Sequence, residues 1–288
     1  EIHEKIGKAI EEIYSDRLEE FYEMLAYHYA RGEVLDKACR YLTLSGNKAA
    51  RRHSVREAYG FYKEALATLQ RLPQTEECKK EQLEVLVLVS APLQILGIPE
   101  GSLDMFQRGE GLAKELGDNR RLAFFYGRLS TYHMFHGDPL LGVQYSEHAV
   151  EEGRKSEDLD LIVPAAYGLC GSYMGAGQLH ELIATARDVI DLIKKKERTP
   201  EFFALHVNAY AGLSAYCGLC LGWMGNFQEG ELFLEKGLRH ATRIGDLRTL
   251  AVVEFFYGNF CHAKGDWQAA AEHHQKTITY CEEAKFVG

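Results

Sequence analysis

Two cysteines in the last third of the chain have the spacing of a chemical motif. Cys217 and Cys220 form a Cys-x-x-Cys pair, which thiol redox enzymes use and which also supplies half of a zinc site. A redox pair needs a helix N-terminus to lower a thiol pKa, whereas this pair falls late in a helical pattern, on one side of the helix. Free cysteine also packs as a small apolar residue. We therefore predict that both cysteines pack in the core.

A second group of residues contains metal-binding types: Cys261, His262, His273 and His274. They fall on two predicted helices that are joined by a turn at Gly265. At a rise of 1.5 Å per residue, the heights of His262 and His273 along this hairpin differ by roughly 7 Å. One zinc ion needs its ligand atoms about 2 Å away. We interpret these histidines as surface or groove residues and predict no metal and no cofactor.

Motifs of the common catalytic sites are missing from the sequence. It has no Gly-x-x-x-x-Gly-Lys-Ser/Thr loop, no Gly-x-Gly-x-x-Gly after a strand, no His-Glu-x-x-His and no Gly-x-Ser-x-Gly. Paired carboxylates such as Glu151-Glu152 lie at helix ends and on polar faces, where charge is normally solvated. We assign no catalytic residue and predict that this segment is not an enzyme. A hidden enzyme is the least favoured alternative.

The charge and the cysteine count limit the partners and the compartment. The 288 residues contain 33 Lys and Arg against 42 Asp and Glu, for a net charge of -9, so we predict no nucleic-acid binding. Seven cysteines scattered through apolar runs do not resemble a disulfide framework, which favours the reducing cytoplasm. The sequence begins with Glu1 rather than Met, and 285–288 follow a helical pattern directly. We expect a piece of a longer protein with a truncated end.

One segment has the length of a membrane span. The run Phe202–Gly225 contains no Asp, Glu, Lys or Arg. It also carries His206, Asn208, Ser214 and several glycines, so its summed hydrophobicity is modest. We predict no membrane interaction.

A repeat organises most of the chain. Glycines that precede short polar turns occur at Gly97, Gly137, Gly177, Gly225 and Gly265, separated by 40, 40, 48 and 40 residues. A constant period of this length indicates stacked supersecondary units. Two helical stretches lie between successive glycines, and no alternating β-branched pattern is present.

Alignment on the turn glycines supports the repeat. Eight residues before the turn lie Leu129, Leu169, Cys217 and Tyr257, and seven before it lie Ser130, Cys170, Gly218 and Gly258. This bulky-small pair resembles the tetratricopeptide repeat, whose first helix carries a Leu-Gly pair, although the period exceeds the usual 34 residues. The resemblance implies an all-α, right-handed superhelix, or solenoid, of about seven antiparallel helix pairs. We place the pairs at 17–44, 45–72, 77–117, 118–157, 158–198, 199–245 and 246–284, after a linker helix at 1–16.

Stacked helix pairs create a concave surface lined by the first helix of each pair. The tetratricopeptide register places eleven residues of interest on it: Phe124, Thr131, Met134, Phe135, Tyr167, Met174, Leu219, Trp223, Phe255, Asn259 and His262. This predicted groove is apolar, aromatic and nearly uncharged. It therefore favours a partner peptide, a helix or another domain of the same protein over a carboxylate clamp. The alternative that superhelix curvature buries some of these side chains stays open.

The first 55 residues carry a second resemblance. The segments Ile2–Glu11, Leu25–Tyr29, Lys37–Leu42 and Ser45–Ala50 resemble a junction in bacterial multidomain signalling proteins. There, a signal-transduction ATPase module precedes tetratricopeptide repeats, often with a class III adenylate or guanylate cyclase domain, and maltose-activator type regulators are similar. The resemblance implies a regulatory sensor arm that binds a protein partner. The alternative is a repeat domain that senses a small-molecule inducer for an ATPase-type transcription regulator.

Overall fold

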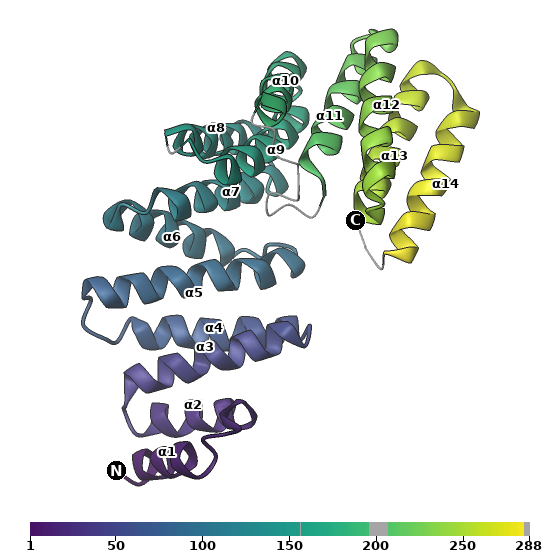
Figure 1. The fold of residues 1–288 in the computed structure, drawn as a ribbon. Helices are drawn as coiled ribbons and strands as arrows, with labels where there is room; N and C mark the ends of the chain where they lie inside the picture. The colour runs from purple at the N-terminus through teal and green to yellow at the C-terminus, as the bar shows by residue number, and fades with distance from the viewer. Residues whose placement is uncertain (156, 196–206, 285–288) are drawn as a thin grey trace. The chain divides into compact units, whose positions relative to one another are not determined.

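The computed structural model describes residues 1–155, 157–195 and 207–284, and this part of the chain is built from α-helices without a strand (Figure 1). The helices are α1 (Ile2–Ile13), α2 (Tyr22–Arg31), α3 (Leu35–Arg51), α4 (Val55–Leu69), α5 (Glu76–Ile95), α6 (Ser102–Leu116), α7 (Asn119–Phe135), α8 (Pro139–Lys155), α9 (Leu159–Ala176), α10 (Leu179–Lys195), α11 (Ala209–Trp223), α12 (Phe227–Ile244), α13 (Leu247–Lys264) and α14 (Trp267–Glu283). A short 3-10 helix, η1 (Leu18–Phe21), precedes α2. The all-α prediction is confirmed.

Consecutive helices form seven pairs, from α1 with α2 to α13 with α14. The chain forms two compact units, Glu1–Arg128 and Leu129–Gly288, and the boundary between these units falls inside α7. The predicted boundary at 44/45 is wrong, because α3 continues through it. The first pair instead consists of α1 and α2, which meet where Gly7 contacts the Tyr29 ring. A linker role for residues 1–16 stays a prediction, and 285–288 and the predicted boundary at 198/199 lie outside the described residues.

The turns inside the pairs need a left-handed backbone. This requirement explains why the repeating glycines locate the later turns of the chain but not the turn between α3 and α4. Gly137, Gly177, Gly225 and Gly265 have φ between 75° and 87°, a region that glycine enters without steric cost. The corresponding turn between α3 and α4 is made by His53, with φ 58°. Since a non-glycine residue occupies this turn, the glycine pattern could not mark it.

Aspartate side chains cap the start of two first helices, α13 and α7. Asp246 accepts a hydrogen bond from the backbone N–H of Thr249 at 2.8 Å, and Asp118 accepts one from that of Arg121 at 2.9 Å. Each bond satisfies an N–H group that the first turn of a helix leaves without a partner. These caps separate one helix pair from the next.

The first unit includes a partly buried polar network. The hydroxyls of Tyr29 and Tyr41 donate to the Glu11 carboxylate at 2.7 and 2.6 Å, and the Lys37 ammonium donates to it at 2.5 Å. Burial acts to raise the pKa of Glu11, but these three hydrogen bonds outweigh it and leave the pKa below its usual range. The network ties α1 to α2 and α3.

In the second unit, α11 is the central helix. Every residue from Ala211 to Gly222 is buried, because α9, α10, α12 and α13 all pack around this helix. Gly218 permits the contact with α12, since a Cβ at this position would lie 2.7 Å from the carbonyl oxygen of Gly230. Cys217 and Cys220 are fully buried here, so the prediction that they pack in the core is confirmed.

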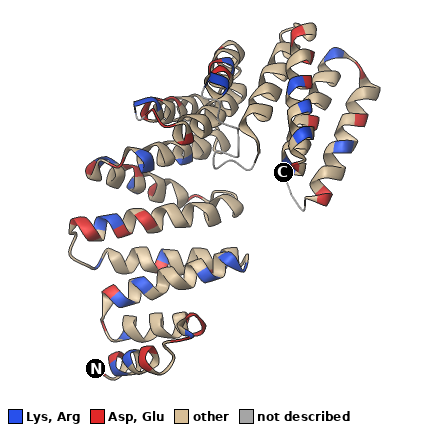
Figure 2. Ribbon diagram, viewed as in Figure 1, with Lys and Arg blue, Asp and Glu red and all other residues tan. Residues whose placement is uncertain are grey.

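The exposed helix faces carry charges of both signs. Figure 2 shows Lys and Arg interspersed with Asp and Glu on the helices of both units. Within the ranges that the structure describes, no helix combines the length and the apolar character needed to cross a membrane. The charge-free run Phe202–Gly225 falls partly outside those ranges, and most of its described part belongs to α11.

Candidate functional site

The structure sorts the eleven predicted groove residues into three classes of exposure. Phe124 belongs to the first unit and the other ten belong to the second. Four are exposed (Phe135, Trp223, Phe255 and His262), and six are partly buried (Phe124, Thr131, Met134, Tyr167, Met174 and Asn259). Leu219 is only 2% exposed and lies in the core, so its predicted place on the open groove is wrong.

Tyr167 fills the space between α9 and α11 rather than lining an open groove. A Cβ on Gly212 would lie 2.5 Å from Cε2 of Tyr167, so the tyrosine ring occupies the place of the missing side chain. The same ring meets Tyr216 edge-on, and Tyr216 in turn contacts Phe256 on α13 at 4.9 Å between centroids. Burial raises the pKa of the Tyr167 and Tyr216 hydroxyls above their usual range. Close packing of the first helices α9 and α11 therefore fills the groove that the sequence predicts between them.

Met134 is also engaged in packing. A Cβ on Gly142 of α8 would lie 2.9 Å from Cγ of Met134, and a Cβ on Gly175 of α9 would lie 2.3 Å from its Cε. The thioether chain thus fills the gap that two glycines leave, a use that suits its flexibility. Met174 packs against the core of the same unit.

Of the four exposed groove residues, Phe135 lies at the end of α7, and Trp223, Phe255 and His262 lie on α11 and α13. We define the α11/α13 surface as Trp223, Phe255, Asn259 and His262. Gly222 brings the two helices together, because a Cβ there would lie 2.4 Å from Cδ2 of Phe260. Trp223 follows directly and is 48% exposed, and Phe255 on α13 is 49% exposed.

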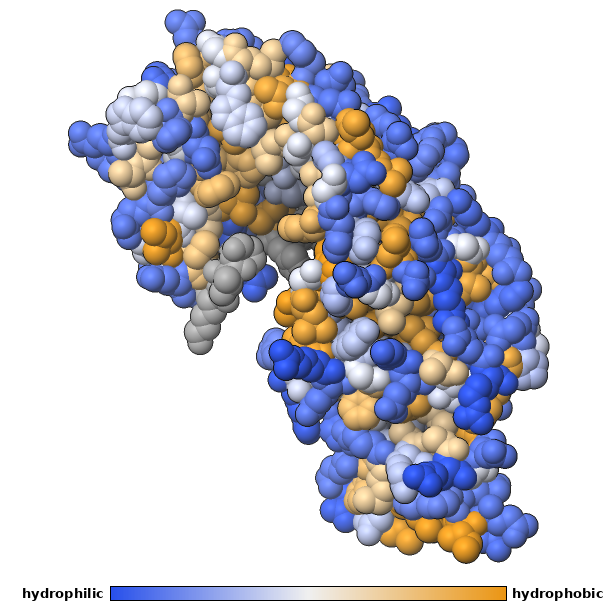
Figure 3. Space-filling view, turned by 180° about the vertical axis from the view of Figure 1, so that it is seen from behind, coloured by the Kyte–Doolittle hydropathy of each residue, from blue (hydrophilic) through white to orange (hydrophobic). Residues whose placement is uncertain are grey.

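Local contacts orient the α13 part of this surface. The Asn259 amide donates to the carbonyl oxygen of Phe255 at 2.8 Å, and the Phe255 ring lies 6.0 Å from the His274 ring. The His262 ring meets Trp267 edge-on at 4.7 Å between centroids. No member of the surface carries a carboxylate, an ammonium or a guanidinium. Figure 3 shows one face of the molecule, where apolar side chains lie in patches between hydrophilic ones.

The chemistry of the remaining candidates is limited by burial and pairing. Burial raises the pKa of the Cys217 and Cys220 thiols to about 12, so the nucleophilic thiolate is scarce at neutral pH. His273 bonds through Nδ1 to the buried carboxylate of Glu254. Among the described residues, no three metal-ligating side chains converge on one point.

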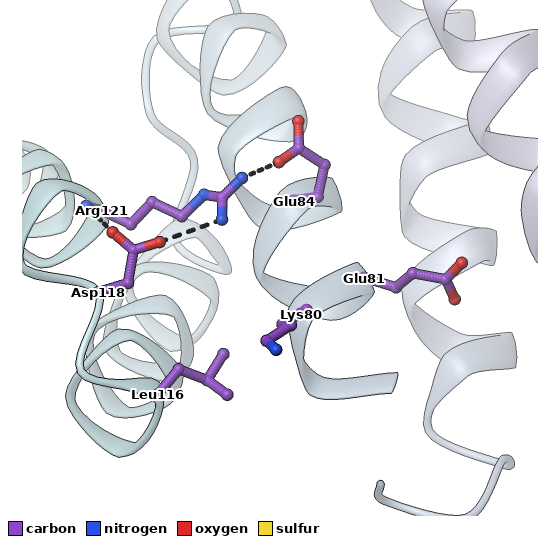
Figure 4. A pocket seen from close by; sticks show the side chains of 6 residues that line it. All are labelled: Lys80, Glu81, Glu84, Leu116, Asp118 and Arg121. Atoms are coloured by element: carbon purple, nitrogen blue, oxygen red, sulfur yellow. Dashed lines mark hydrogen bonds and ion pairs between the residues drawn. The ribbon is translucent and has the colours of Figure 1, made fainter. Parts of the chain in front are cut away.

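A shallow pocket of about 360 Å³ lies in the first unit (Figure 4). The Arg121 guanidinium lines this pocket and forms salt bridges with Glu84 and, at 3.1 Å, with Asp118. Lys80 is paired with Glu76 at 2.5 Å. Because these charges neutralise one another, the pocket offers no evident site for an ionic ligand.

The sequence does not predict two buried polar clusters in the second unit. Glu254 on α13 is buried beside His273 and Lys276 of α14. Ser130, Ser146 and Ser172 bring three buried hydroxyls within 3.1 Å of one another. The sequence marks Ser130 only as the small partner of Leu129, and His273 only as a histidine of the surface or groove. The remaining residues carry no local signal, since the clusters form only when separate helices meet.

No family model matches this sequence, and no curated protein matches it. Solved structures do share the fold. The apo form of RapI has a TM-score of 0.65 at 12% identity, with 93% of this chain and 98% of that chain covered. A Rap protein complexed with competence and sporulation factor has a TM-score of 0.55 at 12% identity, with coverage of 97% and 92%.

A third similar structure contains the nearly identical TPR-like repeats assigned to a kinesin light chain of Podosopora anserina. Its TM-score is 0.58 at 14% identity, with 71% of this chain and 95% of that chain covered. The fold is a tetratricopeptide-like helical repeat. At these identities the likeness concerns the fold alone, and function must be argued from the surface.

Proposed function

We propose that this chain is a non-catalytic protein-interaction and regulatory segment that binds a partner peptide, helix or domain through the α11/α13 surface. One observation carries the proposal. Trp223 and Phe255 are half exposed on the adjacent first helices α11 and α13, whereas Tyr216, Phe256 and Phe260 on the same two helices are buried. Rigid aromatic side chains of this kind supply most of the binding energy in many protein interfaces.

The surface determines the chemistry of its partner. Two aromatic rings flanked by the amide of Asn259 and the imidazole of His262 suit a segment with an apolar or aromatic anchor. A charged terminus of the partner would gain no binding energy here, because the surface offers no ion-pair partner. A helix or an extended peptide would bury its apolar side against the rings, as in other groove-binding modes.

The larger context rests on the resemblance of residues 1–55. We place the segment in a cytoplasmic bacterial signalling protein, as the sensor arm of an ATPase module that is often joined to a nucleotide cyclase, with residues 1–16 as the linker. The complex of a Rap protein with competence and sporulation factor has a similar fold, which supports a regulatory ligand for such a repeat. Regulation requires that the partner bind two states of the protein unequally.

A small-molecule inducer is the second candidate. A pocket of about 310 Å³ between α10, α11 and α12 favours it, with Tyr210 and Phe233 beside Arg187, Lys194 and Lys236. Its size is near the lower limit for small-molecule sites. Thermal shifts with candidate metabolites at constant protein concentration would detect such a ligand. A shift that survives Trp223→Ala but not Phe233→Ala would favour this candidate.

The proposal is tested with peptides selected on the immobilised chain from a random twelve-residue library. The selected peptides should be rich in apolar and aromatic residues. Trp223→Ala and Phe255→Ala should each weaken their binding at least tenfold in fluorescence-polarisation titrations, because each variant removes a central ring.

The matched control is Leu232→Ala, which truncates an exposed apolar residue on α12, a second helix. It should leave the affinity unchanged. Selected peptides that bind all three variants equally would contradict the proposal, and so would a selection dominated by acidic peptides.

A further inference from the structure

The pocket of about 310 Å³ between α10, α11 and α12 collects positive charge. In the second unit, α11 packs against both α10 and α12 (Figure 1). Three cationic side chains line the pocket, Arg187 and Lys194 from α10 and Lys236 from α12. Among the described residues of the lining, two carboxylates accompany them, Asp191 and Glu229. Three positive charges against two negative ones leave the lining with a net charge of +1.

Both carboxylates of the pocket are already paired. Glu229 accepts a hydrogen bond from the Arg187 guanidinium at 2.5 Å. The Asp191 carboxylate lies 3.3 Å from the Lys194 ammonium, one helical turn away. Lys236 forms no ion pair with any carboxylate in the part of the chain that the structure describes. One positive charge of the pocket therefore lacks a counter-charge.

A second unused donor belongs to Arg187. Its Nε atom is buried and has no hydrogen-bond partner, although a terminal nitrogen of the same guanidinium is bonded to Glu229. A guanidinium holds its N–H groups in a planar fork that matches a carboxylate. A buried N–H group without an acceptor is costly, and a bound ion or ligand is one way to satisfy it.

One aromatic ring brings the two unused donors together. The Arg187 guanidinium lies 5.3 Å from the centroid of the Phe233 ring, and the Lys236 ammonium lies 5.2 Å from it. The face of the ring attracts each cation, but two like charges at one ring repel each other. An anionic oxygen that accepts from both groups would remove this repulsion and satisfy both donors.

We propose that this pocket binds a small organic molecule that has one carboxylate group and an apolar body. The inference rests on the small-molecule candidate of the proposed function and uses none of the residues of the α11/α13 surface. The carboxylate accepts hydrogen bonds from the Lys236 ammonium and from the Nε–H group of Arg187. The apolar body contacts the side chains of Tyr210, Leu232 and Phe233, which line the same pocket.

The charge and the size of the pocket select this class of ligand. One carboxylate brings a charge of −1, which balances the net charge of the lining. A phosphate ester carries about −1.5 to −2 at pH 7, and the excess would be repelled by Asp191 and Glu229. The volume lies near the lower limit for small-molecule sites, so a single ring or a short branched chain fits best.

Matched acids and amides test the requirement for charge. Isothermal titration calorimetry at low salt would compare benzoate, phenylacetate and phenylpropanoate with their uncharged amides and with phenyl phosphate. At least one of the three carboxylates should bind, about tenfold more tightly than its own amide. Its affinity should fall as the salt concentration rises, because salt screens the attraction between the two charges.

Substitutions locate the bound acid. Lys236→Gln should weaken the binding of that carboxylate about tenfold, because it removes the unpaired charge. Arg187→Lys should also weaken it, since it keeps the charge but removes the Nε–H group. The matched control is Lys63→Gln, because Lys63 is exposed, also lies over an aromatic ring, that of Tyr59 at 6.0 Å, and is outside this pocket. It should leave the affinity unchanged, and circular dichroism should show the same helix content in every variant.

Several results would overturn the inference. They are a series in which no carboxylate binds, amides that bind as tightly as their acids, and a Lys236→Gln variant that binds like the wild type. Tighter binding of phenyl phosphate than of every carboxylate would contradict the assigned class. Binding lost in Trp223→Ala but kept in Lys236→Gln would place the acid on the α11/α13 surface, so this inference would fail while the proposed peptide surface would stand.

Discussion

The Tyr167 ring on α9 meets the Tyr216 ring on α11 with centroids 5.3 Å apart and planes at 68°. This contact closes the groove between the first helices α9 and α11. Tyr167→Ala should lower the free energy of unfolding by about 2–4 kcal/mol, because it leaves a cavity beside Gly212. Urea unfolding measures this loss. Phe135→Ala, at an exposed ring, should change stability by less than about 0.5 kcal/mol, and equal losses for the two variants would argue against the closed groove.

Two glycines on neighbouring first helices should respond oppositely to alanine. Gly218→Ala should destabilise the fold by about 1–3 kcal/mol, because its Cβ would lie 2.7 Å from a backbone oxygen of α12. Gly168→Ala on α9 meets open space and should stabilise by about 0.5–1 kcal/mol through helix propensity. Thermal unfolding of both variants provides the comparison. If Gly218→Ala were neutral, the close approach of α11 and α12 would be wrong.

The three buried serines should behave as one unit. Ser146→Ala should cost about 1 kcal/mol, because the hydroxyls of Ser130 and Ser172 each lose a hydrogen-bond partner. Replacing all three serines by alanine should cost less than the sum of the single changes, since no buried hydroxyl is then left unsatisfied. Denaturant unfolding of the four variants tests the coupling, and strict additivity would contradict it.

Buried thiols should make the fold sensitive to alkali. Burial raises the pKa of Cys217 and Cys220 to about 12, compared with about 8.5 in an unfolded chain. The unfolded chain therefore loses these protons first, so stability is fully present below about pH 8.5 and declines as pH rises towards 12. We expect unfolding free energies from pH 8 to 10 to fall less steeply in a Cys217→Ala, Cys220→Ala double variant. Identical slopes would show that these thiols do not contribute.

Much of the fold could be predicted because its periodic signal lies in single residues. Gly137, Gly177 and Gly265 adopt the left-handed backbone that makes them visible in the sequence. The first pairs were displaced because Glu33 and His53 adopt the same backbone with a side chain, so the glycine pattern does not mark the turns before and after α3. Cys217 was placed in the core from its position in the repeat alone.

The binding surface was harder to predict, because repeat position determines the helix that a residue belongs to but not how closely the next helix packs. Leu219 and Trp223 lie one helical turn apart, yet only Trp223 is accessible. Beside Trp223, Gly222 admits Phe260 from α13, a close approach that repeat position does not reveal. Such pairs of residues become neighbours only in the folded chain.

Fluorescence of Trp223 tests the central claim most directly. The chain has two tryptophans, so Trp267→Phe leaves Trp223 as the only indole reporter. A selected apolar peptide should shift its emission to the blue, saturably and at the concentration that saturates binding, because the half-exposed indole becomes covered. Peptide that binds with the same affinity while the Trp223 emission stays unchanged would place the partner elsewhere and contradict the α11/α13 surface.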